Sequence, residues 1–235
     1  MKYLKHTTLA LAAFAMLFTA DADARPKKGK WEKLFDGKSL AGWHTYKKAG
    51  QPVSDKWTID DGAIHFTGGR GAGDLVTDKE YGDFELEIEW KISEKGNSGI
   101  IYHVNEDPKY GATYSTGPEM QVLDDAKHPD SFAGSAGNHK AGSLYDMLPP
   151  NDLTAVKPAG EWNKAKLVIK DGRAEHYLNG KKIVEYATNG PEWDKMVANS
   201  KFKSWEGFGK FAKGHLALQD HGDKVWYRNI RIREL

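Results

Sequence analysis

The feature of this chain that most constrains its fold is a nine-residue stretch of strict alternation. From Phe84 to Ile92 every second residue is apolar, and the residues between them are Glu or Lys. A period of two puts the two sets on opposite faces of a β-strand, whereas an amphipathic helix needs apolar residues spaced by three and four. The stretch therefore predicts a strand with one face in the core and the other in water.

Turn dipeptides place more strands around this one. Asp61-Gly62 divides residues 57–66 into a predicted hairpin, and Asp171-Gly172 and Asn179-Gly180 divide residues 166–187 into a predicted three-stranded meander. Such dipeptides are typical of tight hairpins, because a type I′ turn needs positive φ at both central positions. The chain ends in a predicted strand over residues 224–234, on which we expect Trp226, Arg228, Ile230 and Ile232 to share one face.

The composition supports an all-β protein built as a sandwich or jelly roll. Aromatic residues are frequent, with 8 Trp, 10 Tyr and 9 Phe, and the 25 glycines suit tight turns. We expect at most one or two short helices, one of them within residues 191–203. Residues 125–157 are rich in Gly, Pro, Asn and His without periodicity, and a loop of this length in a compact domain is typical of a functional segment.

The N-terminus has the order of a secretory signal peptide. Lys2 and Lys5 precede an apolar run of about a dozen residues, and a small-x-small site at Ala22-Asp23-Ala24 follows. We therefore expect residues 1–24 to be removed and residues 25–235 to form a single domain in the periplasm or outside the cell. No later segment is apolar enough to predict a membrane span in the mature chain.

Charge and cysteine content exclude several classes of function. The net charge is only +1, from 34 basic and 33 acidic residues, so no overall field favours nucleic acid. The chain has no cysteine, which removes thiol chemistry and Cys-ligated metals.

The best candidate site is the predicted strand over residues 117–125. Alternation places Glu119, Gln121, Leu123 and Asp125 on one face. Residues 214–223 give a second polar face, on which His215, Ala217, Gln219 and His221 alternate with Leu216, Leu218 and Asp220. Histidine suits proton transfer near neutral pH. These two segments predict a cleft with a carboxylate and an imidazole.

A third segment, residues 96–104, leads from small residues into a strand. Tyr102 and His103 are adjacent, so they point to opposite faces and only one of them can face a shared cleft. Aromatic rings can stack on the C–H faces of sugars, and we expect such a platform among Tyr102, Tyr145 and Trp205, while the strand tryptophans are expected in the core.

The ordered motifs resemble one known family along nearly all of the mature chain, the 3-keto-disaccharide hydrolase domain family. The resemblance rests on these segments: Leu34-Phe35-Asp36-Gly37, Gly42-Trp43, Asn97-Ser98-Gly99-Ile100, Gly117 to Asp124, Ala141 to Asp146, Gly160 to Asn163, Asn179-Gly180, Leu218 to Gly222, and Trp226 to Ile230. It implies an exported, concanavalin A-like jelly roll of two curved antiparallel sheets. It also implies an enzyme that cleaves 3-keto-glycosides.

A conventional glycoside hydrolase on the same fold is one alternative, but it needs two suitably placed carboxyl groups. Where similar glucanases carry Glu-x-Asp-x-x-Glu, this chain has Glu119-x-Gln121-x-x-Asp124, and Asp124 has the wrong parity to partner Glu119. A carbohydrate-binding module without catalysis is the second alternative, and a scaffold protein the third. A 3-keto sugar favours another route, in which a base removes the acidified C2 proton and the C1 group leaves before water adds.

We expect Glu119 and His221 to be the base and the acid, in an order that the sequence leaves open, and His103 or Arg228 to hold the oxyanion. The expected substrate-binding residues are Gln121, Gln219, Asp125, Tyr102, Tyr145 and Arg228. A divalent metal could stabilise the oxyanion in place of His103 or Arg228. Glu119, His221 and nearby oxygens could hold it, although the sequence does not define a complete set of ligands. The substrate is a keto-glycoside carbohydrate, which implies a sugar 3-dehydrogenase as functional partner.

Overall fold

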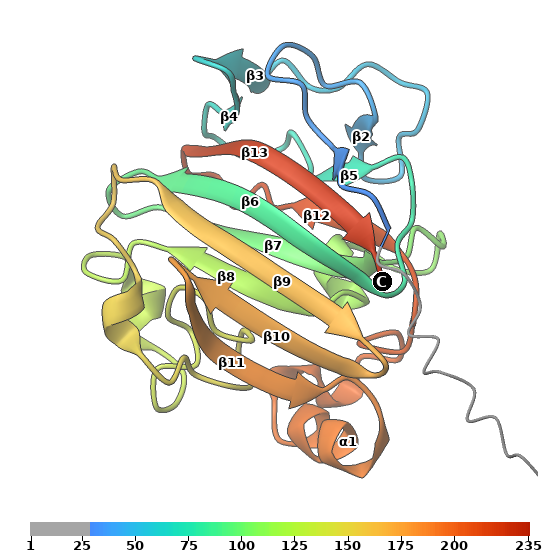
Figure 1. Cartoon of the computed structure of the whole chain (residues 1–235), viewed down its shortest axis with the longest axis vertical. Helices are drawn as coiled ribbons and strands as arrows, with labels where there is room; N and C mark the ends of the chain where they lie inside the picture. Colours follow the sequence, from blue (N-terminus) through green and yellow to red (C-terminus); the bar gives the residue numbers. More distant parts are fainter. Residues whose placement is uncertain (1–28) are drawn as a thin grey trace, which may run out of the picture.

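Residues 29–235, the part of the chain that the structure describes, form two antiparallel sheets in this computed structural model (Figure 1). The large sheet has the order β11-β10-β9-β6-β13-β4-β3, and β1 also pairs with β13; the small sheet has the order β2-β5-β12-β7-β8. The predicted all-β architecture of two antiparallel sheets is confirmed. The expected signal peptide, residues 1–24, lies outside the described residues.

The strands of the large sheet are β1 (Glu32–Lys33), β3 (Trp57–Asp60), β4 (Ala63–Phe66), β6 (Phe84–Ile92), β9 (Asn163–Lys170), β10 (Arg173–Leu178), β11 (Lys181–Ala187) and β13 (Val225–Glu234). Those of the small sheet are β2 (Trp43–Thr45), β5 (Leu75–Thr77), β7 (Asn97–Val104), β8 (Glu119–Leu123) and β12 (His215–Leu218). The one α-helix among the described residues is α1 (Gly190–Ala198), and four short 3₁₀ helices are η1 (Thr113–Ser115), η2 (Pro129–Phe132), η3 (Leu153–Ala155) and η4 (Lys201–Ser204).

The alternating stretch is the central strand β6, which pairs with β9 on one side and β13 on the other. Its apolar residues are buried, while Glu87 and Glu89 face outward. The turn predictions are also confirmed, because Asp61-Gly62, Asp171-Gly172 and Asn179-Gly180 all have positive φ and join the strands on either side. The helix expected within residues 191–203 is α1.

The prediction for the last strand is wrong in its second half. The register between β13 and β6 shifts between Arg228 and Arg231, and Asn229 has a φ of 52°. This bulge adds one residue and reverses the alternation. Consequently Val225 and Tyr227 are buried before the bulge and Ile230 and Ile232 after it, while Trp226 and Arg228 lie on the other face.

The apolar core between the sheets decides which face of the small sheet is free for a site. Met120 and Val122 of β8 belong to the same buried cluster as Leu86 and Trp90 of β6. A hydrogen bond of 2.8 Å between the Ser98 and Tyr227 hydroxyls also joins the two sheets. The residues that alternate with Met120 and Val122, Glu119 and Gln121, therefore face away from the large sheet.

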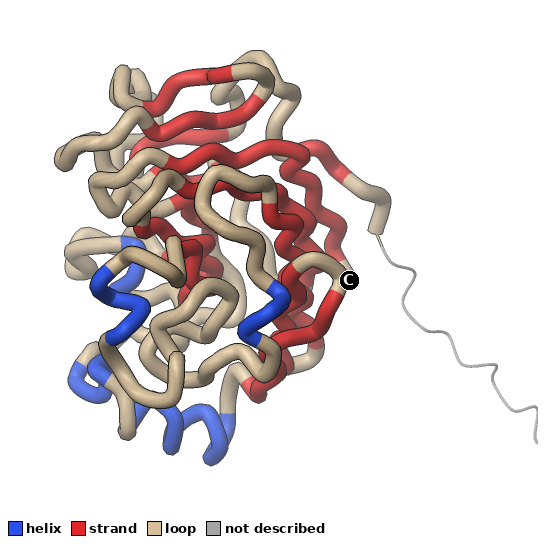
Figure 2. The backbone as a smooth tube through the Cα atoms, turned by 90° about the vertical axis from the view of Figure 1, so that its left-hand side faces the viewer, coloured by secondary structure: helices blue, strands red, loops and turns tan. Residues whose placement is uncertain are grey.

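Loops and short helices gather on one side of the strands in the second view (Figure 2). The irregular segment expected over residues 125–157 contains η2 and η3 and has otherwise no regular structure. Within residues 29–235, no helix has both the length and the apolar character that a membrane crossing requires.

Candidate functional site

A cleft of about 570 Å³ lies on the small sheet, on the face directed away from the large sheet. This is the size range of small-molecule sites. The cleft is lined by Arg70, Gly71, Asn97, Tyr114, Glu119, Gln121, Tyr145, Lys201, Phe202, Trp205, Gln219, Asp220 and His221. The structure thus brings together Glu119, Gln121, Gln219, His221, Tyr145 and Trp205, six residues that the sequence pointed to.

Glu119 provides the buried carboxyl group of this cleft. It begins β8, opposite Ile101 of β7, and only 7% of its surface is exposed. A Cβ on the neighbouring Gly99 would overlap the Glu119 carboxyl, so this glycine provides the space that the carboxyl fills. Burial raises the pKa of Glu119 to about 8, because the charged form loses its hydration, and nearby Lys201 opposes the shift only in part.

The loop after residue 141 continues the small sheet along β8. The Gly142 amide donates to the Gln121 carbonyl at 2.8 Å, and the Tyr145 amide donates to the Glu119 carbonyl at 3.1 Å. This pairing places the Tyr145 side chain beside Glu119 in the cleft. The pKa of the Tyr145 phenol is raised, first by burial and then by the negative charge of Asp130.

Gln219 and His221 follow β12 on the other side of the cleft. The backbone N–H of Gln219 donates to the backbone carbonyl of Gly99 at 3.0 Å, which fixes this segment next to β7. Burial lowers the pKa of the His221 imidazole, and the nearby charge of Asp223 opposes the shift. His221 is consequently a neutral imidazole at neutral pH, able to accept a proton.

Two amide oxygens in the cleft are buried without a hydrogen-bond partner. They are Oδ1 of Asn97 and Oε1 of Gln219, on side chains of residues that are 4% and 7% exposed. A buried acceptor without a donor costs free energy, and native proteins keep few of them. Both oxygens can accept an O–H or N–H group, so they favour a ligand that carries such donors.

Sequence reasoning did not assign seven residues of the cleft to the site: Arg70, Gly71, Asn97, Tyr114, Lys201, Phe202 and Asp220. Asn97 stood in a motif that carried the resemblance, and this was its only signal. Lys201 begins η4, where its amide donates to the Asp146 carboxylate at 2.7 Å and its ammonium lies 4.0 Å from the centre of the Tyr145 ring. No periodic pattern marks Lys201, because a loop brings it to the cleft.

Four residues predicted for the site lie outside the cleft. Tyr102 is in the core, where its hydroxyl hydrogen-bonds to that of Tyr186. His103 has a φ of 53° and its Nε2 hydrogen-bonds to the Gly82 carbonyl at 3.0 Å, in a separate hollow of about 140 Å³ that also reaches Tyr102.

Arg228 is on the large sheet, where it donates to Glu89 at 2.8 Å. Asp125 accepts the Ala141 amide at 2.8 Å and so holds the loop that covers β8. These four predictions failed for one reason. Alternation shows which side chains share a face of a strand, but it does not show which sheet the strand joins or which part of the strand reaches the cleft.

Within residues 29–235, one group of side chains has metal-ligand spacing. Single ligand atoms of His128, His221 and Asp223 lie within 4.8 Å of one another. However, Nδ1 of His128 accepts the Asp130 amide at 3.1 Å, which uses the lone pair of the neutral ring and leaves the proton on Nε2. His221 and Asp223 can serve as ligands, whereas His128 fits a metal only after it releases this amide. Glu119 is not in the group.

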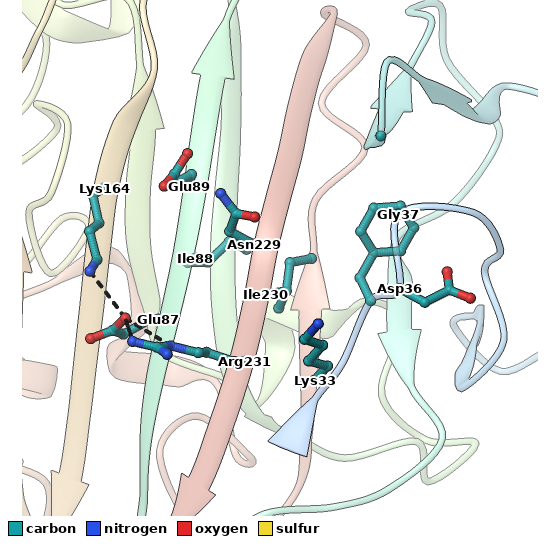
Figure 3. Close-up of a pocket in the computed structure, with 12 residues that line it drawn as sticks. Lys33, Asp36, Gly37, Glu87, Ile88, Glu89, Lys164, Asn229, Ile230 and Arg231 are labelled. Atoms are coloured by element: carbon teal, nitrogen blue, oxygen red, sulfur yellow. Dashed lines mark hydrogen bonds and ion pairs between the residues drawn. The ribbon is translucent and has the colours of Figure 1, made fainter. Parts of the chain in front are cut away.

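Another hollow, which we call the groove, lies on the outer face of the large sheet and measures about 400 Å³ (Figure 3). Its residues include Lys33, Asp36, Glu87, Glu89, Lys164, Asn229 and Arg231. In Figure 3 the Glu87 carboxylate meets two cations, Lys164 at 3.1 Å and Arg231 at 2.6 Å. The pKa of Glu87 is lowered although burial acts against the shift, because these cations stabilise the charge. The groove therefore lacks a free acid or base at this position.

Comparisons with known proteins identify the family of this chain. The family model described as 3-keto-alpha-glucoside-1,2-lyase-like domain matches residues 30–233. A protein of Bacteroides thetaiotaomicron named 3-keto-disaccharide hydrolase is 40% identical over 227 residues, which cover 86% of this chain and 77% of that protein.

Solved structures support the same fold. A structure from Parabacteroides distasonis ATCC 8503 shares 37% identity and a TM-score of 0.79, covering 88% of this chain and 94% of that one. Porphyranase B from Zobellia galactanivorans is 10% identical with a TM-score of 0.52, covering 90% of this chain and 95% of its own, and this likeness concerns the fold alone. The sandwich is the jelly roll that the sequence resemblance implied.

Proposed function

Because the chain belongs to the 3-keto-alpha-glucoside-1,2-lyase-like domain family, we propose that it is a carbohydrate-active enzyme that cleaves 3-keto-glycosides by elimination and hydration. The observation that carries the proposal is that the buried carboxyl of Glu119, with a raised pKa, and the imidazole of His221, with a lowered pKa, line the same cleft. The family relative supplies the substrate class, and the cleft supplies the assignment of roles.

The two pKa shifts support one assignment of the acid and the base. Glu119, with a pKa of about 8, keeps its proton at neutral pH, and His221, with a lowered pKa, has none to give. We therefore assign Glu119 as the acid that protonates the leaving oxygen and His221 as the base that takes the C2 proton. Environments that push two pKa values in opposite directions are the usual way to set such a pair.

The proposed steps balance without an oxidant or reductant. His221 removes the proton from C2, which the C3 ketone makes acidic, and the electron pair forms an enediolate. The C1–O bond then breaks as Glu119 gives its proton to the departing oxygen, leaving an unsaturated keto sugar and a free alcohol. Water then adds to C1 and gives a proton to the Glu119 carboxylate, and the imidazolium, after exchanging its proton with solvent, returns a proton to C2.

We assign to Lys201 the role of stabilising the enediolate oxyanion, which the sequence had assigned to other residues. His103 and Arg228, which were expected in this role, lie outside the cleft. Lys201 lines the cleft, and its positive charge acts on Glu119. A fixed cation next to the developing charge of the enediolate is worth more in a partly dry cleft than in water.

A conventional glycosidase is the alternative that the carboxyl groups argue against. Of the acidic residues that line the cleft, only Asp220 accompanies Glu119. The Asp220 carboxylate already accepts the amides of Ala72 and Gly73, each at 3.0 Å, and of Gly222 at 3.1 Å. It holds the loop that carries Arg70, so it is a poor partner for a two-carboxylate mechanism.

Deuterium labelling separates the two mechanisms. The purified protein is incubated with 3-keto-trehalose in D₂O, and early product is analysed by NMR, with added 3-keto-glucose as the control for exchange without enzyme. Elimination and hydration place deuterium at C2 of the product, whereas direct displacement at C1 leaves hydrogen there. Cleavage without deuterium would overturn the proposed route, and sugar binding without cleavage would favour a binding module.

Two further parts of the proposal have their own tests. A divalent ion near His221 and Asp223 would be an alternative holder of the enediolate charge, and activity lost to a chelator and restored by one metal would favour it over Lys201. Export to the periplasm or beyond follows from the N-terminal sequence, and cell fractionation tests it. The keto group of the substrate requires an enzyme that oxidises C3, so a sugar 3-dehydrogenase is the proposed functional partner.

A further inference from the structure

One side of the cleft is aromatic and comes from loops rather than from the sheet. Tyr114 lies in η1 and Trp205 directly follows η4, and their ring centres are 5.8 Å apart at an angle of 40°. The Tyr114 side is open, since 43% of this residue is exposed. Both residues line the same cleft as Glu119.

Trp205 has a rigid support behind it. Its ring meets Phe202 edge-on at 5.0 Å, and Phe202 stacks on Phe208 at 3.9 Å. Phe202 and Phe208 are buried in the core. Trp205 is thus held by packing, while one part of it faces the cleft, as in a binding platform that needs little ordering when a ligand arrives.

The part of the cleft that the sheet forms is polar and carries the reacting groups. Glu119, Gln121, Asn97 and Gln219 come from β7, β8 and the end of β12, and the unpaired amide oxygens are on this side. A ring with many hydroxyl groups satisfies these oxygens, whereas an apolar ring does not. The keto sugar therefore belongs over the sheet, where the acid and the base are.

The group attached at C1 must then extend toward the remaining part of the cleft. We propose that Tyr114 and Trp205 form a subsite for the leaving group, and that it takes a ring with an apolar face, as in the second sugar of a disaccharide or an aryl group. A sugar ring presents C–H groups on one face, which pack on an aromatic ring. This inference rests on the proposed function for the direction in which the substrate lies.

Kinetics with two substrates tests the subsite. The variants Trp205→Ala and Tyr114→Ala are compared with the wild type on 3-keto-trehalose and on the 3-keto derivative of methyl glucoside, which lacks a second ring. We expect the ratio of kcat/KM for the disaccharide to kcat/KM for the methyl glycoside to fall about tenfold, mainly through KM. Phe132→Ala is the matched control, because Phe132 is 73% exposed and does not line the cleft.

An unchanged ratio in both folded variants would overturn the subsite, and thermal unfolding followed by circular dichroism shows that each variant is folded. If the wild type cleaves neither substrate, the proposed function fails, and the subsite is then tested by calorimetry with unoxidised trehalose and methyl glucoside. Tighter binding of trehalose that is lost in Trp205→Ala would uphold the subsite alone. Equal binding of the two sugars would reject it as well.

Discussion

The cleft on the small sheet and the groove on the large sheet contain the same kinds of side chain, but they treat a carboxyl group in opposite ways. Glu87 in the groove meets Lys164 and Arg231, and its pKa is lowered. Glu119 in the cleft is 7% exposed and forms no ion pair with any residue of 29–235, and its pKa is raised to about 8. Paired charges stabilise the surface of a fold, whereas an isolated buried acid is retained at the cost of stability and is available for chemistry.

The largest expected effect comes from removing the acid of the cleft and not that of the groove. Glu119→Gln should lower kcat about 10²- to 10⁴-fold, the usual contribution of one acid or base. Glu87→Gln, the matched change in the groove, should leave kcat within about twofold, because the two ion pairs of Glu87 lie on the large sheet, outside the cleft that holds the reacting groups. Steady-state cleavage of 3-keto-trehalose measures both, and equal losses in the two variants would contradict the contrast.

The second comparison uses the pH dependence of stability. Its direction follows from the proton that Glu119 keeps in the folded state. Between pH 4.5 and 8 the unfolded chain has released this proton while the folded chain keeps it, so the folded state is destabilised as pH rises through that window. The stability advantage of Glu119→Gln over the wild type should therefore grow across the window, by on the order of 5 kcal/mol. Urea unfolding at both ends of the window measures it.

An advantage of Glu119→Gln that is the same at both pH values would show that the carboxyl is not held neutral. The same proton governs activity. An acid with a pKa of about 8 should make kcat fall as pH rises through that value.

The third effect concerns the glycine that makes room for the carboxyl. Gly99→Ala places a Cβ where the Glu119 carboxyl lies, and overpacking of this kind costs about 1–3 kcal/mol. It should also lower kcat by displacing the acid. Gly111→Ala is the control, because nothing lies within 4 Å of a Cβ at that position. Thermal unfolding and kcat are measured together, and a Gly99→Ala protein with normal values of both would show that the contact does not position Glu119.

The smallest expected effect is the stability that the groove itself contributes. Glu87→Gln removes the pairs with Lys164 and Arg231, whose side chains are 52% and 46% exposed. Exposed pairs contribute below about 1 kcal/mol each, and salt screens them. The loss in urea unfolding should shrink at high salt. A large loss that salt does not change would mean that the groove is more than a surface ion-pair network.

Local patterns determined most of the fold. Strict alternation identified β6, and Asp-Gly and Asn-Gly turns located the hairpin β3–β4 and the meander β9–β11, because these features depend on neighbouring residues alone. The error in strand parity at Asn229 came from a bulge that pairing with β6 reveals and sequence does not. The candidate segments around Glu119 and His221 were also identified from alternation and residue chemistry.

Tertiary structure decided which candidates meet. It brought Glu119, Gln219 and His221 together with Lys201, Tyr114 and Asn97, and placed Tyr102, His103, Arg228 and Asp125 elsewhere.

The sequence by itself thus determined the strands, the turns and the types of side chain on each face, since these follow from the periods of local structure. Only the packed sheets decided that Glu119 has no ion-pair partner among the described residues and that Glu87 has two. Burial and the approach of distant loops fix these surroundings, and no local pattern encodes them.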